Sequence, residues 1–327
     1  MKAVELTEIA CPLCNSQHSK KLWDVRDYGR RISDQKFGLQ RCLECGVGYV
    51  SPRPSEKDIG EFYDPGFYWA YEGAEPLNPE ALLEVRRPQL EAKAEVIAHL
   101  PPGKLLDIGA QKGDFLYYMA KKGWEVEGVE FSKLPPNVFN QTIHYGEFLE
   151  MEFGEARYDC ITMWAVLEHV WRPREYIEKA ASLLKPGGRL IVLVTNLNSI
   201  QGRIYRQDDY PRHLTIFTKN SLRRLYGSIG LSTHRVWTDQ KIFGGSLYGG
   251  LVYMTKRLLG YTPDEVYYEW RGSEGSLFFS KFRGKNSLFI KTVSRIDRLV
   301  TLLPERLLDR MGYGAIVMLE AEKAFNV

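Results

Sequence analysis

The sequence predicts an α/β protein: an open, mostly parallel sheet, preceded by a small cysteine-containing module and interrupted before its last strand by a helical insertion. Three observations support this prediction. Two Cys-x-x-Cys pairs lie close to the amino terminus. A short apolar strand that begins at Leu105 runs into a glycine turn and a helix. From there to about residue 240, apolar strands alternate with helical stretches.

Composition and charge are those of an ordinary globular protein. Of the 327 residues, 44% are hydrophobic and 26% are charged, and the formal net charge is +3. A charge this small does not indicate a nucleic-acid-binding protein. No apolar run is long enough to span a bilayer, and the first residues carry no apolar signal region. We therefore expect a cytoplasmic protein.

Four of the five cysteines follow the pattern C-x2-C-x27-C-x2-C. They are Cys11, Cys14, Cys42 and Cys45. Two such pairs can place four thiolates tetrahedrally around one zinc ion, and the metal then stabilises a module too small for a core of its own. Two disulfides or a redox pair are the alternatives, and a cytosolic compartment disfavours the disulfides. With four protein ligands this zinc would be structural. The fifth, Cys160, is expected to be a core residue.

An aromatic stretch joins the cysteine module to the sheet. Ser55 is expected to cap a short helix that ends at Phe62. The aromatic residues of the stretch are Phe62, Tyr63, Phe67, Tyr68, Trp69 and Tyr71. They favour a packing surface between module and sheet, and a lid over a bound cation is the alternative, which can hold at the same time. Residues 81–99 then predict a helix that is interrupted near Pro88.

The glycine turn follows the strand Leu105–Ile108. Gly109 and Gly113 have the spacing Gly-x-x-x-Gly, which does not fit the dinucleotide fingerprint Gly-x-Gly-x-x-Gly. Open α/β sheets nevertheless build nucleotide sites from a short apolar strand, a glycine turn and a helix. Here the helix begins near Asp114. The next strand ends at Glu130, where a carboxylate is placed to bond ribose hydroxyls.

Three further stretches follow in order. Residues 143–147 predict a third strand that ends in an acidic residue. Residues 158–170 form an apolar strand that emerges into Glu168 and His169, at the strand end where parallel sheets bind ligands. A helix then leads through a Lys-Pro-Gly-Gly turn into a strand over 189–195.

This order of motifs resembles that of the class I S-adenosylmethionine (SAM)-dependent methyltransferases, over about residues 80–240. The first motif of that family is Asp-x-Gly-x-Gly-x-Gly, and Gln111 stands where the family usually has the middle glycine. The Leu-Glu-His ending and the Lys-Pro-Gly-Gly turn are two further hallmarks of the family. With its cysteine module, the chain resembles zinc-ribbon methyltransferases that act on sugars and glycans.

The resemblance implies a Rossmann-like sheet of seven strands whose last strand is antiparallel, with SAM at the glycine turn. Glu130 would bond the ribose, and Glu147 would accept a hydrogen bond from the adenine amino group. The residues assigned to the cofactor on this basis are Asp107, Gly109, Ala110, Gly113, Phe115, Glu130, Phe131, Glu147, Trp164 and Glu168.

Methyl transfer from a sulfonium is an in-line displacement, so the protein mainly positions the acceptor and removes its proton. Histidine titrates near neutral pH and suits that base. We expect His213 to be the base, because it lies in a polar loop after the fifth strand that should face the open substrate side. An alternative is that His213 and Phe217 only anchor this loop.

Some ribbon-bearing sugar methyltransferases resemble this chain in carrying a Tyr-x-x-His in the same place, matched here by Tyr210 and His213. Arg212 replaces the acidic residue that the family has before the histidine. His169, at the edge of the crevice beside Glu168, is the second candidate base. The other histidines are expected to be structural: His18, His99, His144 and His234.

The last third of the chain predicts a sixth strand over 231–237 and a seventh over 313–323, with an insertion between them. Part of the insertion, 286–303, has the pattern of an amphipathic helix, with a further turn to Met311. Residues 280–311 carry eight basic and three acidic residues, a local charge of +5. Such a helix usually packs on its own core or another subunit, and contact with an anionic membrane surface is the alternative.

The sequence thus predicts five parts: a zinc ribbon (1–54), an aromatic linker and helix (55–100), a SAM-binding core (101–239), a helical insertion (240–312) and the final strand (313–327). The predicted function is methylation of a hydroxyl on a sugar or glycan intermediate in polysaccharide biosynthesis. A C- or N-methyltransferase of a nucleotide sugar or other small metabolite is one alternative. A protein that binds or modifies RNA is another. Gln111 prompts a third, a scaffold without catalysis.

Overall fold

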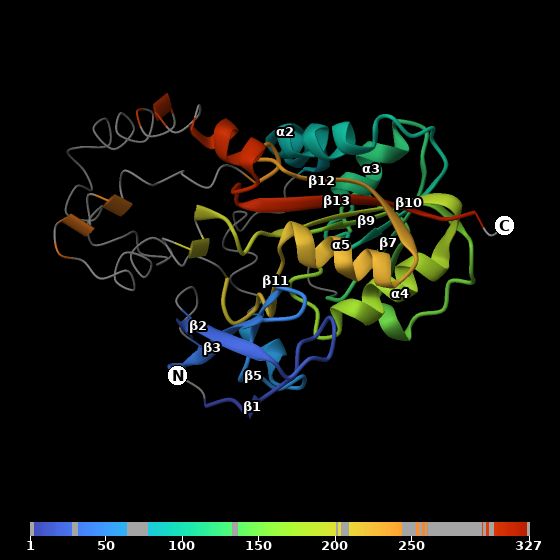
Figure 1. Cartoon of the computed structure of the whole chain (residues 1–327). Helices are drawn as coiled ribbons and strands as arrows, with labels where there is room; N and C mark the ends of the chain where they lie inside the picture. The colour runs from blue at the N-terminus through green and yellow to red at the C-terminus, as the bar shows by residue number, and fades with distance from the viewer. Residues whose placement is uncertain are drawn as a thin grey trace.

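The computed structural model describes residues 3–27, 32–63, 78–132, 137–200, 202–203, 209–243, 253–254, 257–258, 260, 296, 299–300 and 304–325. These residues form a large sheet with helices on both faces and a smaller N-terminal module beside it (Figure 1). In this part of the chain we find no helix with the length and apolar character needed to cross a membrane.

The large sheet has seven strands in the order β12-β13-β10-β9-β6-β7-β8. Their bounds are β6 (Lys104–Ile108), β7 (Glu125–Glu130), β8 (Ile143–Tyr145), β9 (Tyr158–Trp164), β10 (Leu184–Thr195), β12 (Leu231–Thr238) and β13 (Ile316–Lys323). Strand β13 is antiparallel to β10 and β12, and the pairs from β10 to β8 are parallel. The predicted sheet with an antiparallel last strand is therefore confirmed. Strands β6, β7 and β9 are neighbours, so their carboxyl ends meet at one edge.

Helices cover both faces of this sheet. On one face lie α2 (Pro79–Ile97) and α3 (Asp114–Ala120), and on the other lie α4 (Pro173–Leu183) and α5 (Lys219–Ser228) (Figure 1). The two buried cores agree with this arrangement. Leu105 packs in the cluster of α2 and α3, whereas Leu106 packs in that of α4 and α5, as expected for successive residues of a strand.

Two local predictions about helix and turn boundaries were wrong. Helix α2 runs through Pro88 without a break. Proline in a helix interior costs about 3 kcal/mol, but α2 buries Leu90 and Ile97 on the sheet, and this packing outweighs the missing hydrogen bond. The Lys-Pro-Gly-Gly segment is not a separate turn, because it lies within β10, whose pairing with β9 is irregular between Leu184 and Arg189.

The N-terminal module contains two small sheets. Strands β2 (Ser19–Val25), β3 (Phe37–Cys42) and β4 (Gly48–Val50) belong to one, and β1 (Leu6–Thr7) pairs with β5 (Arg53–Pro54) in the other. A short 3-10 helix, η1 (Ile59–Phe62), follows. The side chain of Ser55 does not cap it as predicted, since the bonds from the N–H groups of Asp58 and Ile59 go to the Ser55 carbonyl (3.0 and 2.9 Å).

The module shares a strand with the core. Strand β11 (Thr215–Ile216) pairs antiparallel with β4 and completes a four-stranded sheet. The close approach requires Gly48, because a Cβ there would lie 3.0 Å from Cδ1 of Leu197 and 3.3 Å from the Ile216 carbonyl oxygen. Residues 210–217 are buried, so the loop around His213 is not the open polar loop that the sequence predicted.

Several predictions fall wholly or partly outside the described residues. They are the aromatic residues Phe67, Tyr68, Trp69 and Tyr71, and most of the predicted helix 286–303. Of the apolar residues in that predicted helix, Ile296, Leu299 and Val300 are described, and all three are exposed. Residues 304–311 are helical, as predicted for the further turn.

Candidate functional site

The glycine turn between β6 and α3 is fixed by its neighbours. Gly109 and Gly113 have φ angles of 84° and 80°, a region that favours glycine because it has no Cβ. A Cβ on Gly109 would also lie 2.4 Å from Cγ2 of Val166, which follows β9. The N–H groups of Gly109 and Ala110 both donate to the carbonyl of Val129 in β7 (2.8 and 2.9 Å). The turn therefore lies against the ends of both neighbouring strands.

Gln111 keeps the backbone shape that a glycine would favour. Its φ angle is 47°, in the left-handed region, which costs an ordinary residue about 1 kcal/mol. Its N–H donates to Oε2 of Glu130 at 2.9 Å, and its side chain lies 3.4 Å from Nη1 of Arg86. Glu130 also accepts from the N–H of Ser132 at 3.2 Å. The departure from the family motif is thus held in place by contacts from α2 and β7.

Asp107 is buried at the end of β6. The hydroxyl of Thr162 donates to its Oδ1 at 2.5 Å. Burial raises the pKa of Asp107 to about 7, against the opposing effect of Lys93. The ammonium of Lys93 lies 5.6 Å from the ring centroid of Phe115 and 5.5 Å from that of Trp164. Its pKa is lowered, chiefly by burial.

Sequence reasoning missed Lys93. The residue lies on α2 between the buried residues Leu90 and Ala94, so a lysine on the apolar face of a predicted helix was the available signal. Within the described residues its ammonium group makes no hydrogen bond or ion pair. Lys93 and the Asp107 carboxyl lie close enough for each charge to affect the pKa of the other group.

The remaining predicted cofactor residues differ in accessibility. The rings of Phe115 and Trp164 are buried and meet edge to face at 5.5 Å, whereas Phe131 is 70% exposed. The carboxylate of Glu147 accepts from the Tyr176 hydroxyl at 2.5 Å and from the N–H of Leu149 at 3.2 Å. Phe115 and Trp164 thus lie below the turn, as its packing support.

Glu168, His169 and His213 come together at the end of β9. One carboxylate oxygen and one ring nitrogen from each histidine lie within 4.8 Å of one another. The two imidazole rings are 4.4 Å apart and nearly perpendicular. Glu168 is fully buried, and its backbone carbonyl accepts from Leu214 and Thr215 (2.8 and 3.1 Å). The sequence assigned Glu168 to the cofactor, but the structure groups it with the two histidines.

Neighbouring residues orient this histidine cluster. The hydroxyl of Tyr63, from the N-terminal module, lies 3.1 Å from Nδ1 of His169. Burial lowers the pKa of His169 well below 6.5, with the nearby His213 adding to the effect, so the imidazole is neutral at neutral pH. Arg212 is buried in an ion pair with Asp209. The residue that stands where the family has an acidic residue is therefore held in an ion pair.

The other predicted residues lie elsewhere. Tyr210 is buried among apolar residues of the N-terminal module. Each of the four histidines expected to be structural lies within 3.5 Å of a carboxylate: His18 near Glu44, His99 near Glu320, His144 near Glu127 and His234 near Glu322. None of these four belongs to the described cluster at the end of β9.

The region that contains both sites matches a known family. Residues 82–236 match the model described as a methyltransferase domain, and the seven-stranded sheet has the architecture that the resemblance implied. This region is a class I SAM-dependent methyltransferase domain. The match includes the glycine turn, Glu130, Glu168 and both clustered histidines, so these residues lie inside the methyltransferase domain.

Curated relatives of the methyltransferase domain are named for ubiquinone biosynthesis. The O-methyltransferase of Alkalilimnicola ehrlichii is 30% identical over 120 residues, which is 34% of this chain and 49% of that protein. That of Paraburkholderia phytofirmans is 28% identical over 151 residues, or 43% of this chain and 63% of that protein. The chain thus spans about half the length of the first of these relatives.

A solved SAM-dependent methyltransferase from Thermotoga maritima aligns with 81% of this chain and 99% of its own, with 17% identity and a TM-score of 0.47. That likeness is too distant to bear on function.

The residues around the glycine turn fit SAM. Gly109 and Gly113 have positive φ angles, so the backbone turns sharply between β6 and α3. The carboxyl of Asp107 and the ammonium of Lys93 offer opposite charges to the amino and carboxylate groups of the methionine part of SAM.

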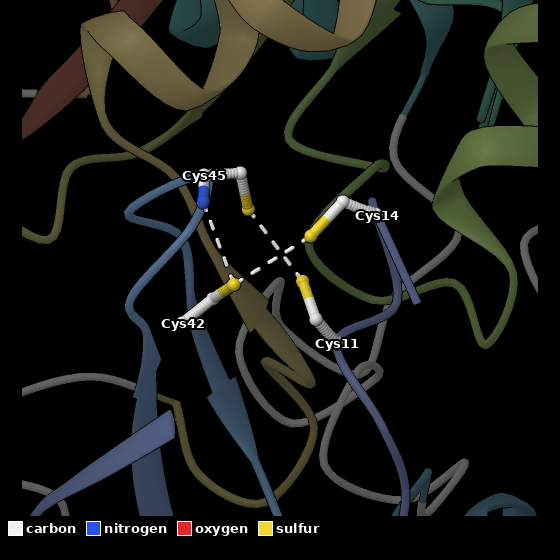
Figure 2. A group of neighbouring side chains, drawn as sticks. All are labelled: Cys11, Cys14, Cys42 and Cys45. Atoms are coloured by element: carbon white, nitrogen blue, oxygen red, sulfur yellow. Dashed lines mark hydrogen bonds between the residues drawn. The ribbon is translucent and has the colours of Figure 1, made fainter. Parts of the chain in front are cut away.

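The four N-terminal cysteines converge outside the domain match. Figure 2 shows their Sγ atoms facing a common centre. The Sγ atoms of Cys11 and Cys45 are 3.5 Å apart, and those of Cys14 and Cys42 are 3.6 Å apart. Four thiolates bound to one zinc ion at about 2.3 Å would be about 3.8 Å apart. The hydrogen bond from Cys11 lowers the pKa of Cys45 to about 5. The cluster therefore fits one structural zinc ion with four thiolate ligands.

Proposed function

We propose that this protein transfers the methyl group of SAM to a hydroxyl of a sugar or glycan intermediate. One observation carries the proposal: in the methyltransferase domain the rings of His169, which follows β9, and His213, which precedes β11, lie 4.4 Å apart beside the Glu168 carboxylate. Oxygen acceptors need a group that removes the hydroxyl proton, and an imidazole can do so near neutral pH.

On the cofactor side, the residues of the chain would hold and orient SAM. SAM supplies a methyl group on a positively charged sulfur, which an in-line nucleophile can displace. Asp107 would bind the cationic amino group, and Lys93 would bind the carboxylate. Glu130 would accept from the ribose hydroxyls while still holding the N–H of Gln111. Arg86 and Asp114, which also lie near the turn, pair with each other at 2.8 Å.

On the acceptor side, His213 would take the hydroxyl proton. Its neighbour His169 is neutral because burial lowers its pKa, so the pair does not begin with a repulsive charge. The Tyr63 hydroxyl would then keep the His169 ring in place through Nδ1. The proton leaves the acceptor oxygen as the carbon–oxygen bond forms and the carbon–sulfur bond breaks. General-base action of this kind contributes about 100- to 10,000-fold in rate.

A second acceptor class has support from the relatives. The curated relatives are named as O-methyltransferases of ubiquinone biosynthesis, and their name points to an oxygen acceptor of a different kind, such as an aromatic hydroxyl. Both acceptor classes require a base next to the methyl group. A sugar acceptor is favoured here because of the resemblance of the cysteine module and the Tyr-x-x-His segment to sugar methyltransferases.

The first experiment is calorimetric titration of the zinc-loaded protein with SAM, followed by an acceptor panel of nucleotide sugars and catechols. Mass spectrometry would count the methyl groups, and NMR would locate them on oxygen, carbon or nitrogen. Methylation of a sugar oxygen supports the proposal. Methylation of a catechol alone would move the acceptor to the aromatic class. Absence of SAM binding would overturn the enzymatic function.

A pair of variants tests the base. His213→Ala should lower kcat about 100-fold or more and leave the SAM affinity unchanged, because the residue lies on the acceptor side. His234→Ala is the matched control, since His234 also contacts a carboxylate but lies on β12. Equal rates for His213→Ala and the wild type would contradict the role of His213.

A further inference from the structure

The histidine cluster has a composition that general-base chemistry does not require. A base needs one imidazole, yet Glu168, His169 and His213 bring one carboxylate oxygen and two ring nitrogens within 4.8 Å of one another. The carboxylate is fully buried, whereas His169 is partly exposed. A buried carboxylate is stable only with hydrogen bonds, an opposite charge or a metal ion beside it.

The spacing is close to that of a ligand set. Zinc and similar ions bind imidazole nitrogen and carboxylate oxygen at about 2.0–2.2 Å, which puts neighbouring ligand atoms about 3.0–3.5 Å apart. The three side chains would reach that spacing by small rotations, because their ligand atoms are already within 4.8 Å. All three residues are in described segments, at the end of β9 and in the loop that leads into β11.

The types of ligand atom in the cluster also favour a transition-metal ion. Two imidazole nitrogens and one carboxylate are the ligands of zinc, iron, cobalt or nickel, whereas magnesium and calcium prefer sites made of oxygen alone.

We propose that Glu168, His169 and His213 bind one divalent transition-metal ion at the end of β9, separate from the zinc ion of the four cysteines. A coordination sphere with three protein ligands leaves positions open for a further oxygen ligand, unlike the closed four-thiolate cluster. The open positions would face the acceptor, and a hydroxyl bound there loses its proton more readily.

Groups around the cluster match those that orient metal-binding histidines. A ring nitrogen of His169 is hydrogen-bonded to the backbone of Arg212, and such outer contacts fix the ring of a ligating histidine. The Tyr63 hydroxyl, 3.1 Å from Nδ1, is close enough to become an additional oxygen ligand. An imidazole nitrogen that binds the ion cannot also accept a proton. The ion and the general base are therefore alternative ways to activate an acceptor at this site.

The test counts and identifies metal ions in the untagged full chain. The protein is stripped with a chelator, given one equivalent of zinc for the cysteines and then excess cobalt(II), and its metal content is measured after desalting. We expect two ions per chain. The cobalt spectrum should show the bands of nitrogen and oxygen ligands, without the intense charge-transfer absorption of thiolates.

Variants locate the second ion. Glu168→Gln and His169→Asn should each reduce the content from two ions to one, whereas the control His234→Asn should retain both. If the wild-type chain holds only one ion with its cysteine site filled, the proposal is overturned. If the variants do not fold, X-ray absorption on the wild-type protein decides, because imidazole ligands to cobalt give a distinct scattering pattern and their absence contradicts the proposal.

The same samples separate this inference from the proposed function. SAM titration uses the glycine turn and needs no metal at the histidine cluster. A chain that binds SAM but only one ion retains the proposed function and loses the second metal site. A chain that binds two ions but not SAM retains the metal site and loses the proposed function.

Discussion

The glycine turn and the histidine cluster, which we propose as the cofactor side and the acceptor side, are built in different ways. The cofactor side comes mainly from one continuous stretch, β6 to the end of β7, in which the backbone itself sets the geometry through Gly109, Gln111 and Gly113. The acceptor side combines Tyr63 of the N-terminal module with His169 after β9 and His213 before β11. It therefore depends on how separate parts of the chain pack together.

This difference predicts which changes affect one side alone. The glycine turn is held by hydrogen bonds within the large sheet, so it should survive damage to the N-terminal module. The histidine cluster is held by Tyr63 and by the pairing of β11 with β4. Damage to the N-terminal module should therefore disrupt the cluster. Four substitutions test the comparison.

The largest effect is expected from Cys11→Ser. The zinc of such a cluster contributes on the order of 10 kcal/mol to the folding of a small module, so its loss should unfold residues 3–54. We expect the zinc content to fall and trypsin to cleave this segment, while SAM binding persists. The control Cys160→Ala, in the core, should retain zinc. Loss of SAM binding together with the module would show that the two sides are not independent.

Asp107→Asn tests the charge beneath the glycine turn. The folded-state pKa of about 7 lies above the ordinary 3.8, so ionisation is harder in the folded than in the unfolded chain. The stability due to this carboxyl is fully present below pH 3.8 and is lost as the pH rises through about 7. Between these limits the free energy of unfolding of the wild type should fall by up to about 4 kcal/mol relative to that of Asp107→Asn.

Urea unfolding of the ligand-free wild type and variant, at about pH 5 and about pH 8, measures this difference. At the higher pH, Asp107→Asn should be more stable relative to the wild type than it is at the lower pH. The matched control is Asp159→Asn, because Asp159 is paired with Lys185 at 2.8 Å and has a lowered pKa. Its difference in unfolding free energy from wild type should be nearly equal at the two pH values, because a lowered pKa changes stability only as the pH falls below 3.8. Identical gaps at both pH values would contradict a raised pKa for Asp107.

Lys93→Met tests the missed cation on α2. A charged hydrogen bond to the methionine carboxylate is worth about 1.5–3 kcal/mol, so the affinity for SAM should fall roughly 10- to 100-fold. The affinity for methylthioadenosine, which lacks the amino and carboxylate groups, should not change. Calorimetry with both ligands measures the two values. Equal losses for both would mean that Lys93 only supports the packing of Phe115 and Trp164.

The smallest effect is expected from Gln111→Gly. Glycine relieves the left-handed backbone strain, although it also makes the unfolded chain more flexible, so the gain should be at most about 1 kcal/mol. Ala110→Gly is the control, because Ala110 does not have a positive φ angle. This variant should be less stable than the wild type. Thermal unfolding measures both. A loss in Gln111→Gly would show that the contact with Arg86 matters more than the strain.

The sequence predicted the sheet and the zinc cluster well because their signals are local. The apolar runs around Leu105 and Ile161, the glycine spacing and the paired cysteines each describe structure within a few residues of themselves. The order of the seven strands and the antiparallel β13 are confirmed. The roles of the individual site residues stay predictions.

The errors come from contacts between distant segments. Asp209, Arg212 and His213 gave their loop a polar composition, but Asp209 and Arg212 neutralise each other and the strand that follows is buried against β4. Lys93 was missed because only the packing of α2 places its ammonium group near the rings of Phe115 and Trp164. Its position on the apolar face of the helix was the one local signal.

The strand shared by module and core also sets an order of assembly. Strands β2, β3 and β4 are synthesised early, but their sheet lacks its fourth strand until residues 215–216 have left the ribosome. By then β6 to β10 are already made, and each parallel pairing among them closes a long segment of chain, which is slow. The N-terminal module therefore has an open strand edge until residues 215–216 are made. An exposed edge can pair with other chains. A cluster of four cysteines that binds metal early would stabilise the three-stranded sheet until β11 pairs with it.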